Sequence, residues 1–266
     1  MKKIFIAFFV ALLAFPLAAQ TAEYYYMRGL IYAEKGDQDS AIADFTRAIN
    51  LNPNDAYYWV DRGNAYMDKG DSDSAISDFN RVISMDPTME SAYYSRGAAN
   101  YALGNLDKAL DDYNKAIALN PTEPSYLGER GRTYLDMGDP DSAIADFTKS
   151  LSMDATQNDV LVSLGEAYLA KGDINKAIDN LTKAINADPN QESSWLSRGE
   201  AYIEIGDPTK AIADINKAID INPNNAASWN ARSTAYLALQ NYEQAIKDLD
   251  KALELDPNGD NFSLNR

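Results

Sequence analysis

A period of 34 residues runs through almost the whole chain and constrains its fold more than any other feature. A glycine recurs six times at this spacing, and a serine replaces it in the seventh unit; these residues are Gly29, Gly63, Gly97, Gly131, Gly165, Gly199 and Ser233. The seven units follow one another without insertion or deletion, as 22–55, 56–89, 90–123, 124–157, 158–191, 192–225 and 226–259. Such a period predicts a repeat protein in which each unit buries its apolar face against its neighbours.

Each repeat has the pattern of two helices separated by a glycine. In repeat two, apolar residues at helical spacing precede and follow Gly70, and Pro87 closes the unit. A glycine at this point can adopt the left-handed conformation that ends a helix. Position 20 is alanine in every repeat, as at Ala41, and we expect it to face the glycine at position 8 so that the helices cross closely.

These residues resemble the tetratricopeptide repeat (TPR), whose pattern has aromatic residues at positions 4 and 24, Gly at 8, Tyr at 11, Ala at 20 and 27, and Pro at 32. The resemblance implies an all-α fold, a right-handed α-solenoid (superhelix) of seven antiparallel helix pairs with a concave groove. It places the solenoid at 20–259 and leaves a short C-terminal tail at 260–266. It also implies a binding protein that is not an enzyme.

The junction from Ser150 to Leu161 departs most from the pattern. Ser150 replaces the alanine at position 27, Ala155 replaces the proline at position 32, and Leu161 replaces the aromatic at position 4. A hinge at this junction is one interpretation. Sequence drift in a tolerant array is the simpler one, because repeat interfaces absorb variation locally.

An arginine at position 7 and an aspartate at position 23 occur together in six repeats, whereas repeat five has Leu164 and Asn180 instead. This joint absence predicts a bidentate, partly buried ion pair between the two helices of each of the six repeats. The role of the pairs is structural. The predicted pairs are Arg28–Asp44, Arg62–Asp78, Arg96–Asp112, Arg130–Asp146, Arg198–Asp214 and Arg232–Asp248.

Composition excludes several functions. With 40 acidic and 24 basic residues, the net charge of −16 disfavours nucleic acid as a partner. No Cys or His is present, so thiol nucleophiles, disulfides and the usual zinc ligand are missing. The calcium-like segments, such as Gly36–Ser40, lack the further ligands of an EF-hand and are more simply helix N-caps. We expect no catalytic residue, cofactor or metal.

The TPR resemblance places a partner-binding groove on the first helix of each repeat, at positions 2, 5, 9, 12 and 13. The residues there are mainly apolar or acidic, which favours a protein or peptide partner with a cationic or apolar segment. Each tyrosine among them is either an anchor for the partner or a packing residue between helices. The predicted groove residues are Glu23, Tyr26, Leu30, Glu34, Tyr57, Val60, Asn64, Met67, Asp68, Tyr94, Tyr101, Arg132, Asp136, Glu166, Leu196, Glu200 and Glu204.

The first residues have the three-part layout of a secretory signal peptide, 1–19. Lys2 and Lys3 precede an apolar run from Ile4 to Leu17, and Ala19 supplies a small residue for cleavage. The run is short for a membrane span, although an uncleaved anchor is the alternative. We therefore expect a periplasmic or secreted protein with no membrane span after cleavage, and one that is not a lipoprotein because it has no cysteine.

Together these features predict an exported scaffold for the assembly or escort of cell-envelope proteins. A glycan-binding solenoid is the alternative, since aromatic faces and carboxylates also suit sugars. The segment after Pro257 is too short for a capping helix, so we also expect that uncapped ends allow a homodimer.

Overall fold

The computed structural model describes residues 21–257, and all the regular structure in this range is helical. The predicted signal peptide and C-terminal tail lie outside the described residues. The described helices, fourteen in number, fit about seven pairs, and the predicted all-α solenoid fold is confirmed. They are α2 (Ala22–Glu34), α3 (Gln38–Leu51), α4 (Ala56–Asp68), α5 (Ser72–Met85), α6 (Glu90–Ala102), α7 (Leu106–Leu119), α8 (Pro124–Asp136), α9 (Pro140–Met153), α10 (Asn158–Lys171), α11 (Ile174–Ala187), α12 (Glu192–Glu204), α13 (Pro208–Ile221), α14 (Ala226–Ala238) and α15 (Tyr242–Leu255).

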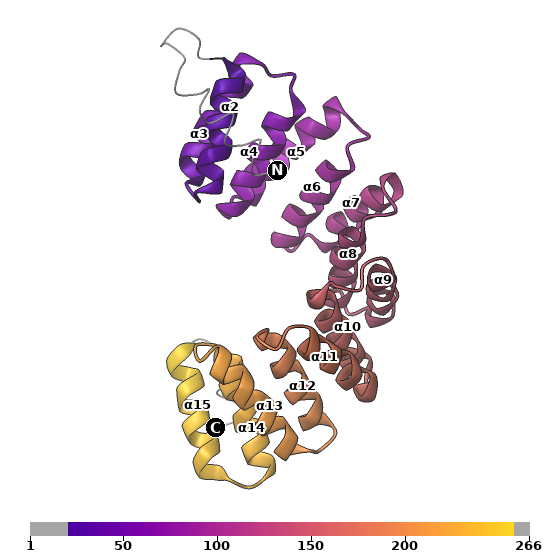
Figure 1. Cartoon of the computed structure of the whole chain (residues 1–266), viewed down its shortest axis with the longest axis vertical. Helices are drawn as coiled ribbons and strands as arrows, with labels where there is room; N and C mark the ends of the chain where they lie inside the picture. The colour runs from indigo at the N-terminus through magenta and orange to yellow at the C-terminus, as the bar shows by residue number, and fades with distance from the viewer. Residues whose placement is uncertain (1–20, 258–266) are drawn as a thin grey trace. The chain divides into compact units, whose positions relative to one another are not determined.

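The chain forms two compact units, Met1–Pro121 and Thr122–Arg266. The first unit contains α2 to α7 and the second contains α8 to α15. Within each unit, every helix packs against the next one along the chain, as the ribbon shows (Figure 1). First helices of successive repeats also contact one another, for example α10 and α12. Each unit is therefore a stack of helix pairs in which neighbours share the core.

The turn between the two helices of a repeat depends on a left-handed residue. Gly36, Gly70 and the four equivalent glycines have φ between +73° and +82°. Repeat seven places Gln240 there, with φ +58°. A side chain in this conformation is strained, since its Cβ approaches the neighbouring carbonyl oxygen.

The glycine at position 8 accommodates a large side chain of the second helix. A Cβ on Gly63 would lie 2.6 Å from the ring of Phe79, and a Cβ on Gly29 would lie equally close to Phe45. The nearest neighbours of this glycine are therefore the position 24 side chains rather than Ala41 and its equivalents, although Ala211 also lies close to Gly199. The residue at position 24 fills the space, and it is fully buried in both examples.

Aspartate side chains cap five of the seven described second helices. The carboxylates of Asp37, Asp71 and Asp139 accept hydrogen bonds from backbone N–H groups three residues later, at 3.1–3.2 Å. Hydrogen bonding to Ser74 lowers the pKa of Asp71. This confirms the N-cap interpretation of the calcium-like segments.

Side-chain hydrogen bonds close the irregular junction between repeats four and five. The hydroxyl of Ser150 donates to the carbonyl of Pro124 at 2.8 Å, and the amide of Gln157 donates to the carbonyl of Asp154 at 3.0 Å. Ser150 is fully buried, and α9 packs directly against α10. This packing favours drift over a hinge at the junction, where polar contacts replace the missing alanine and proline.

Candidate functional site

The arginines and aspartates predicted to pair lie together in all six repeats. In each pair the guanidinium donates two hydrogen bonds to one carboxylate, at 2.5–2.9 Å. The aspartates are buried; the side chain of Asp214 is 9% exposed and that of Arg198 14%. This bidentate geometry joins the first and second helices of a repeat.

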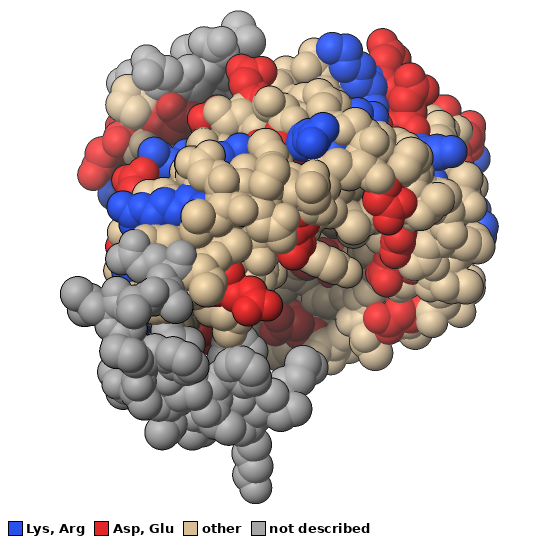
Figure 2. Space-filling model, turned by 90° about the horizontal axis from the view of Figure 1, so that it is seen from above, with Lys and Arg blue, Asp and Glu red and all other residues tan. Residues whose placement is uncertain are grey.

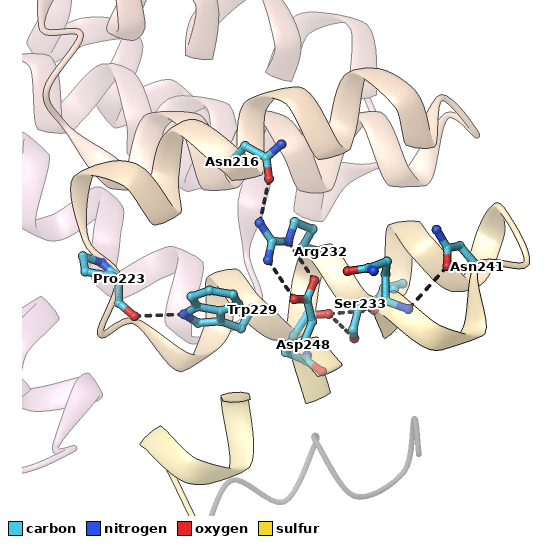
Figure 3. A network of polar contacts seen from close by, with 10 residues as sticks. Asn216, Pro223, Trp229, Arg232, Ser233, Asn241 and Asp248 are labelled. Atoms are coloured by element: carbon cyan, nitrogen blue, oxygen red, sulfur yellow. Dashed lines mark hydrogen bonds and ion pairs between the residues drawn. The ribbon is translucent and has the colours of Figure 1, made fainter. Parts of the chain in front are cut away.

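Four of these arginines also reach the preceding repeat, a contact that the sequence analysis missed. Arg232 donates to the amide oxygen of Asn216 at 2.7 Å and lies over the ring of Trp229 (Figure 3). Trp229 in turn donates to the carbonyl of Pro223 at 2.9 Å. Arg62, Arg96 and Arg198 make the equivalent bond to Thr46, Asn80 and Thr182. The arginine thus links helices within a repeat and also links adjacent repeats.

Repeat five has two uncharged residues, Leu164 and Asn180, in place of the ion pair. Leu164 is 5% exposed and belongs to an apolar cluster with Phe147 and Ala143. The amide of Asn180 donates to the backbone carbonyl of Lys176 at 2.8 Å. Because the arginine and the aspartate are both absent from this repeat, neither of them is left as an unpaired buried charge.

The predicted groove residues of both units all retain contact with solvent. Half-buried members are mostly apolar or tyrosine, namely Tyr26, Leu30, Val60, Met67, Tyr94, Tyr101, Glu166 and Leu196. The exposed members are mostly polar, namely Glu23, Glu34, Tyr57, Asn64, Asp68, Arg132, Asp136, Glu200 and Glu204. Across the face shown in Figure 2, Asp and Glu form several separate groups among uncharged residues. We call the full set of predicted groove residues the first-helix surface.

Of the four predicted groove tyrosines in the first unit, Tyr26 and Tyr94 pack against neighbouring rings. Tyr26 lies 4.7 Å from Tyr58 between ring centroids, and Tyr94 lies 5.9 Å from Tyr113. Tyr57 is different, because it is 63% exposed. Tyr101 is half-buried, so Tyr57 is the groove tyrosine of this unit that exposes most of its ring to a partner.

Asp61, which the sequence analysis did not select, accepts a 2.7 Å hydrogen bond from the hydroxyl of Tyr26. Burial raises the pKa of the Asp61 carboxyl, and the Tyr26 bond opposes this shift only in part. Burial and the hydrogen bond to Asp61 also raise the pKa of Tyr26. No basic side chain lies within 4.0 Å of Asp61 among residues 21–257, so its charge is available to a cationic partner.

In the second unit, carboxylates from α10 and α12 lie near one another. Burial raises the pKa of Glu166, whose carboxylate accepts a 3.0 Å hydrogen bond from Ser197. Glu200 touches solvent, yet the surrounding protein and then the charges of Glu166, Glu204 and Glu192 raise its pKa to about 7. A cation bound here would relieve this repulsion.

Two adjoining pockets open on the first-helix surface of the second unit. One, of about 220 Å³, lies between α8 and α10 and includes Gly128 in its lining. The other, of about 390 Å³, lies between α8, α10 and the start of α12. Arg132, Asp159 and Ser163 line both.

Position 6 of the repeat supplies several of the polar side chains described above, although it was not among the predicted groove positions. It holds Asp61, Ser163 and Ser197, and the first and last of these bond to a side chain of the preceding repeat. The polar character of position 6, set among apolar and aromatic neighbours, was the available signal.

Within residues 21–257, no three acidic, Cys or His side chains gather closely enough to hold a metal ion. None of the helices in this range combines the length and apolar character needed to cross a bilayer.

Models of the tetratricopeptide repeat match residues 60–124, 112–145 and 196–260, and a TPR repeat model matches 29–70 and 165–206. No curated protein sequence matches the chain. A solved tetratricopeptide repeat protein from Parabacteroides merdae is 22% identical, with a TM-score of 0.77 over 93% of this chain and 98% of its own. The type IV pilus biogenesis factor PilW is 18% identical, with a TM-score of 0.72 over 79% and 97%. YrrB, a TPR protein with an unusual peptide-binding site, is 20% identical, with a TM-score of 0.57 over 71% and 97%. At these identities the likeness shows the fold.

Proposed function

Because the chain belongs to the tetratricopeptide repeat family, we propose that it is a non-enzymatic scaffold that binds a protein or peptide on the first-helix surface of its units. The observation that carries this proposal is the composition of that surface, in which half-buried apolar and tyrosine side chains lie beside exposed carboxylates. Such a surface offers apolar anchors with a charged rim. Its fold is also that of YrrB, whose structure is described as having a peptide-binding site.

The preferred partner carries a cationic or apolar segment. Asp61 in the first unit and Glu166 and Glu200 in the second are partly desolvated carboxylates, and their raised pKa values mark unfavourable negative charge. A basic partner lowers that electrostatic cost on binding. Its affinity falls as salt is added, because mobile ions screen exposed charges.

The proposal is tested with the chain from Gln20 to Arg266 as bait in a native extract, at low and high salt. Tyr57→Ala removes the most exposed groove tyrosine, and Tyr242→Ala on α15 is a matched control, because that ring is 61% exposed outside the predicted groove. We expect a captured partner that is lost with Tyr57→Ala and with salt but retained with Tyr242→Ala. Equal loss in both variants, or no captured protein, would contradict groove binding.

We further propose that the protein is exported and serves the assembly or escort of envelope proteins. The layout of residues 1–19 supports export, and the fold shared with PilW is compatible with an envelope role. N-terminal sequencing of the protein from fractionated cells tests this. A mature start near Gln20 in the periplasmic or secreted fraction is expected, whereas an intact Met1 in the membrane fraction would establish the anchor instead.

A homodimer is a separate proposal, supported by Tyr242 and Ile246 of α15, which are 61% and 50% exposed. Light scattering at micromolar concentration should give twice the monomer mass, and a monomer mass would refute it. Glycan binding has less support, because the connections between the described helices, such as 52–55, have at most four residues.

A further inference from the structure

Gly128 leaves a gap in the first-helix surface of the second unit. It occupies position 5 of repeat four, where the other repeats have a larger residue, for example Val162 and Leu196 in the same unit. Packing does not require glycine here, because an added Cβ would meet only Val160 within 4 Å, at 3.4 Å. Gly128 also lies inside α8, where glycine is unfavourable. The glycine thus opens the pocket of about 220 Å³ without a packing reason for its presence.

The pocket and its neighbour have an apolar floor and a net negative lining. Val160 and Phe147 supply apolar surface beside Gly128. Three carboxylates line the two pockets, those of Glu129, Asp159 and Glu166, against one guanidinium, that of Arg132.

These carboxylates have no cation partner in the described part of the chain. No ion pair within 4.0 Å involves Glu129, Asp159 or Glu166 there, and Arg132 forms none either. The positive field of Arg132 does reach Glu166, whose pKa it lowers against the larger effect of burial. The pockets therefore favour a positive ligand over a negative one.

Ser163 supplies independent evidence for a ligand. It is 7% exposed, it lines both pockets, and its hydroxyl makes no hydrogen bond to any other described residue. The serine at the same position in repeat six, Ser197, does bond, to Glu166. Because Ser163 lines the pockets and its hydroxyl has no partner among the described residues, a ligand group in the pocket can bond to this hydroxyl without displacing a protein contact.

We propose that this site, defined by Gly128, Glu129, Asp159 and Ser163, receives one Lys or Arg side chain of the bound segment. The inference rests on the proposed peptide-binding function and specifies its anchor. The aliphatic stem of the basic residue lies over Gly128 and Val160, in the place that a side chain at position 5 fills in other repeats. Its charged head donates hydrogen bonds to the carboxylates of Glu129 and Asp159 and to the hydroxyl of Ser163.

The test begins with random twelve-residue peptides selected on the full chain at low salt. In each selected peptide, every basic residue is replaced in turn by norleucine, which keeps an aliphatic stem and removes the charge. Fluorescence anisotropy then measures affinity for the wild type and for Asp159→Asn, Glu129→Gln, Arg132→Gln and Gly128→Ala. Asp179→Asn on α11 is the matched control, because Asp179 is exposed and does not line either pocket.

We expect one basic residue whose replacement weakens binding to the wild type about tenfold, but has little effect with Asp159→Asn. Gly128→Ala should weaken binding of the same peptide. The melting temperature of this variant should stay at or above that of the wild type, so that the lost binding cannot be explained by lost folding. Arg132→Gln should strengthen binding, because it removes a repelling charge. Asp179→Asn should leave affinity unchanged.

Each contrary result has its own meaning. Peptides that bind with no basic residue coupled to Asp159 would overturn this inference and leave the binding function intact. Acidic peptides that are lost with Arg132→Gln would overturn it in favour of an anion site. Failure to select any peptide would overturn the proposed function and the inference together.

Discussion

The ion pair of repeat six can be exchanged for the uncharged pair of residues found in repeat five. Arg198→Leu combined with Asp214→Asn transfers Leu164 and Asn180 to their equivalent positions. Asn180 bonds to the backbone carbonyl of Lys176, four residues before it. Lys210 occupies the equivalent position in repeat six, so its carbonyl can accept the same bond from the new asparagine. We predict that the double variant is far more stable than either single variant.

The magnitude follows from the burial of the two charges. Arg198→Leu alone leaves the Asp214 carboxylate, 9% exposed, without its partner. Removal of one member of a buried pair costs about 3–5 kcal/mol. The double variant loses the bond to Thr182, about 1 kcal/mol, and the stacking on Trp195, about 0.5–1 kcal/mol. Burial of the leucine offsets about 1.5 kcal/mol or more of this.

The free energies of unfolding of the wild type, both single variants and the double variant form a double-mutant cycle, measured by urea denaturation with helical circular dichroism. We expect the double variant within about 1 kcal/mol of the wild type and a coupling energy of at least about 2 kcal/mol. Added salt should change the coupling little, because the pair is shielded from mobile ions. If the double variant costs as much as the two single variants summed, the pair is not coupled and the reasoning is refuted.

Three further predictions use other features of the helices. Gln240→Gly should raise the free energy of unfolding by about 1 kcal/mol, since it relieves φ +58°, and a chemical melt that shows no gain would contradict this. Gly63→Ala should lower the free energy of unfolding by about 1–3 kcal/mol or more, because the new Cβ lies 2.6 Å from Phe79. Gly128→Ala is the control that should not lower it, because its Cβ makes only an ordinary contact with Val160 at 3.4 Å. In the folded protein the pKa of Glu200 is raised to about 7, whereas in the unfolded chain this carboxyl has its ordinary, lower pKa. The folded state therefore binds the proton more tightly, and the free energy of unfolding falls as pH rises from about 5 to 8. Glu200→Gln should flatten that fall in thermal melts, and an unchanged pH profile would show that the carboxyl titrates normally.

Much of the fold was predictable because its causes repeat. A glycine that ends the first helix, an aspartate that caps the second and a proline that follows it recur at a spacing of 34 residues in most repeats, so each repeat supports the interpretation of the others. The Arg–Asp pairs were predictable for a different reason, since Leu164 and Asn180 change together. The residue opposite Gly63 was not, because the pattern gives spacing along a helix and leaves open which side chain of the partner helix meets it.

The site was harder to predict because it depends on departures from the repeat. The resemblance to other repeats selects positions 5 and 9 but says nothing of position 6, where Asp61, Ser163 and Ser197 face the preceding repeat. A glycine at position 5 is conspicuous in the sequence only once the structure shows that Val160 leaves room for a side chain there. In a periodic scaffold, residues that obey the period hold the stack together. In the proposed site, recognition falls to residues such as Gly128 and Ser163, where the stack leaves space or a hydroxyl without a partner among the described residues.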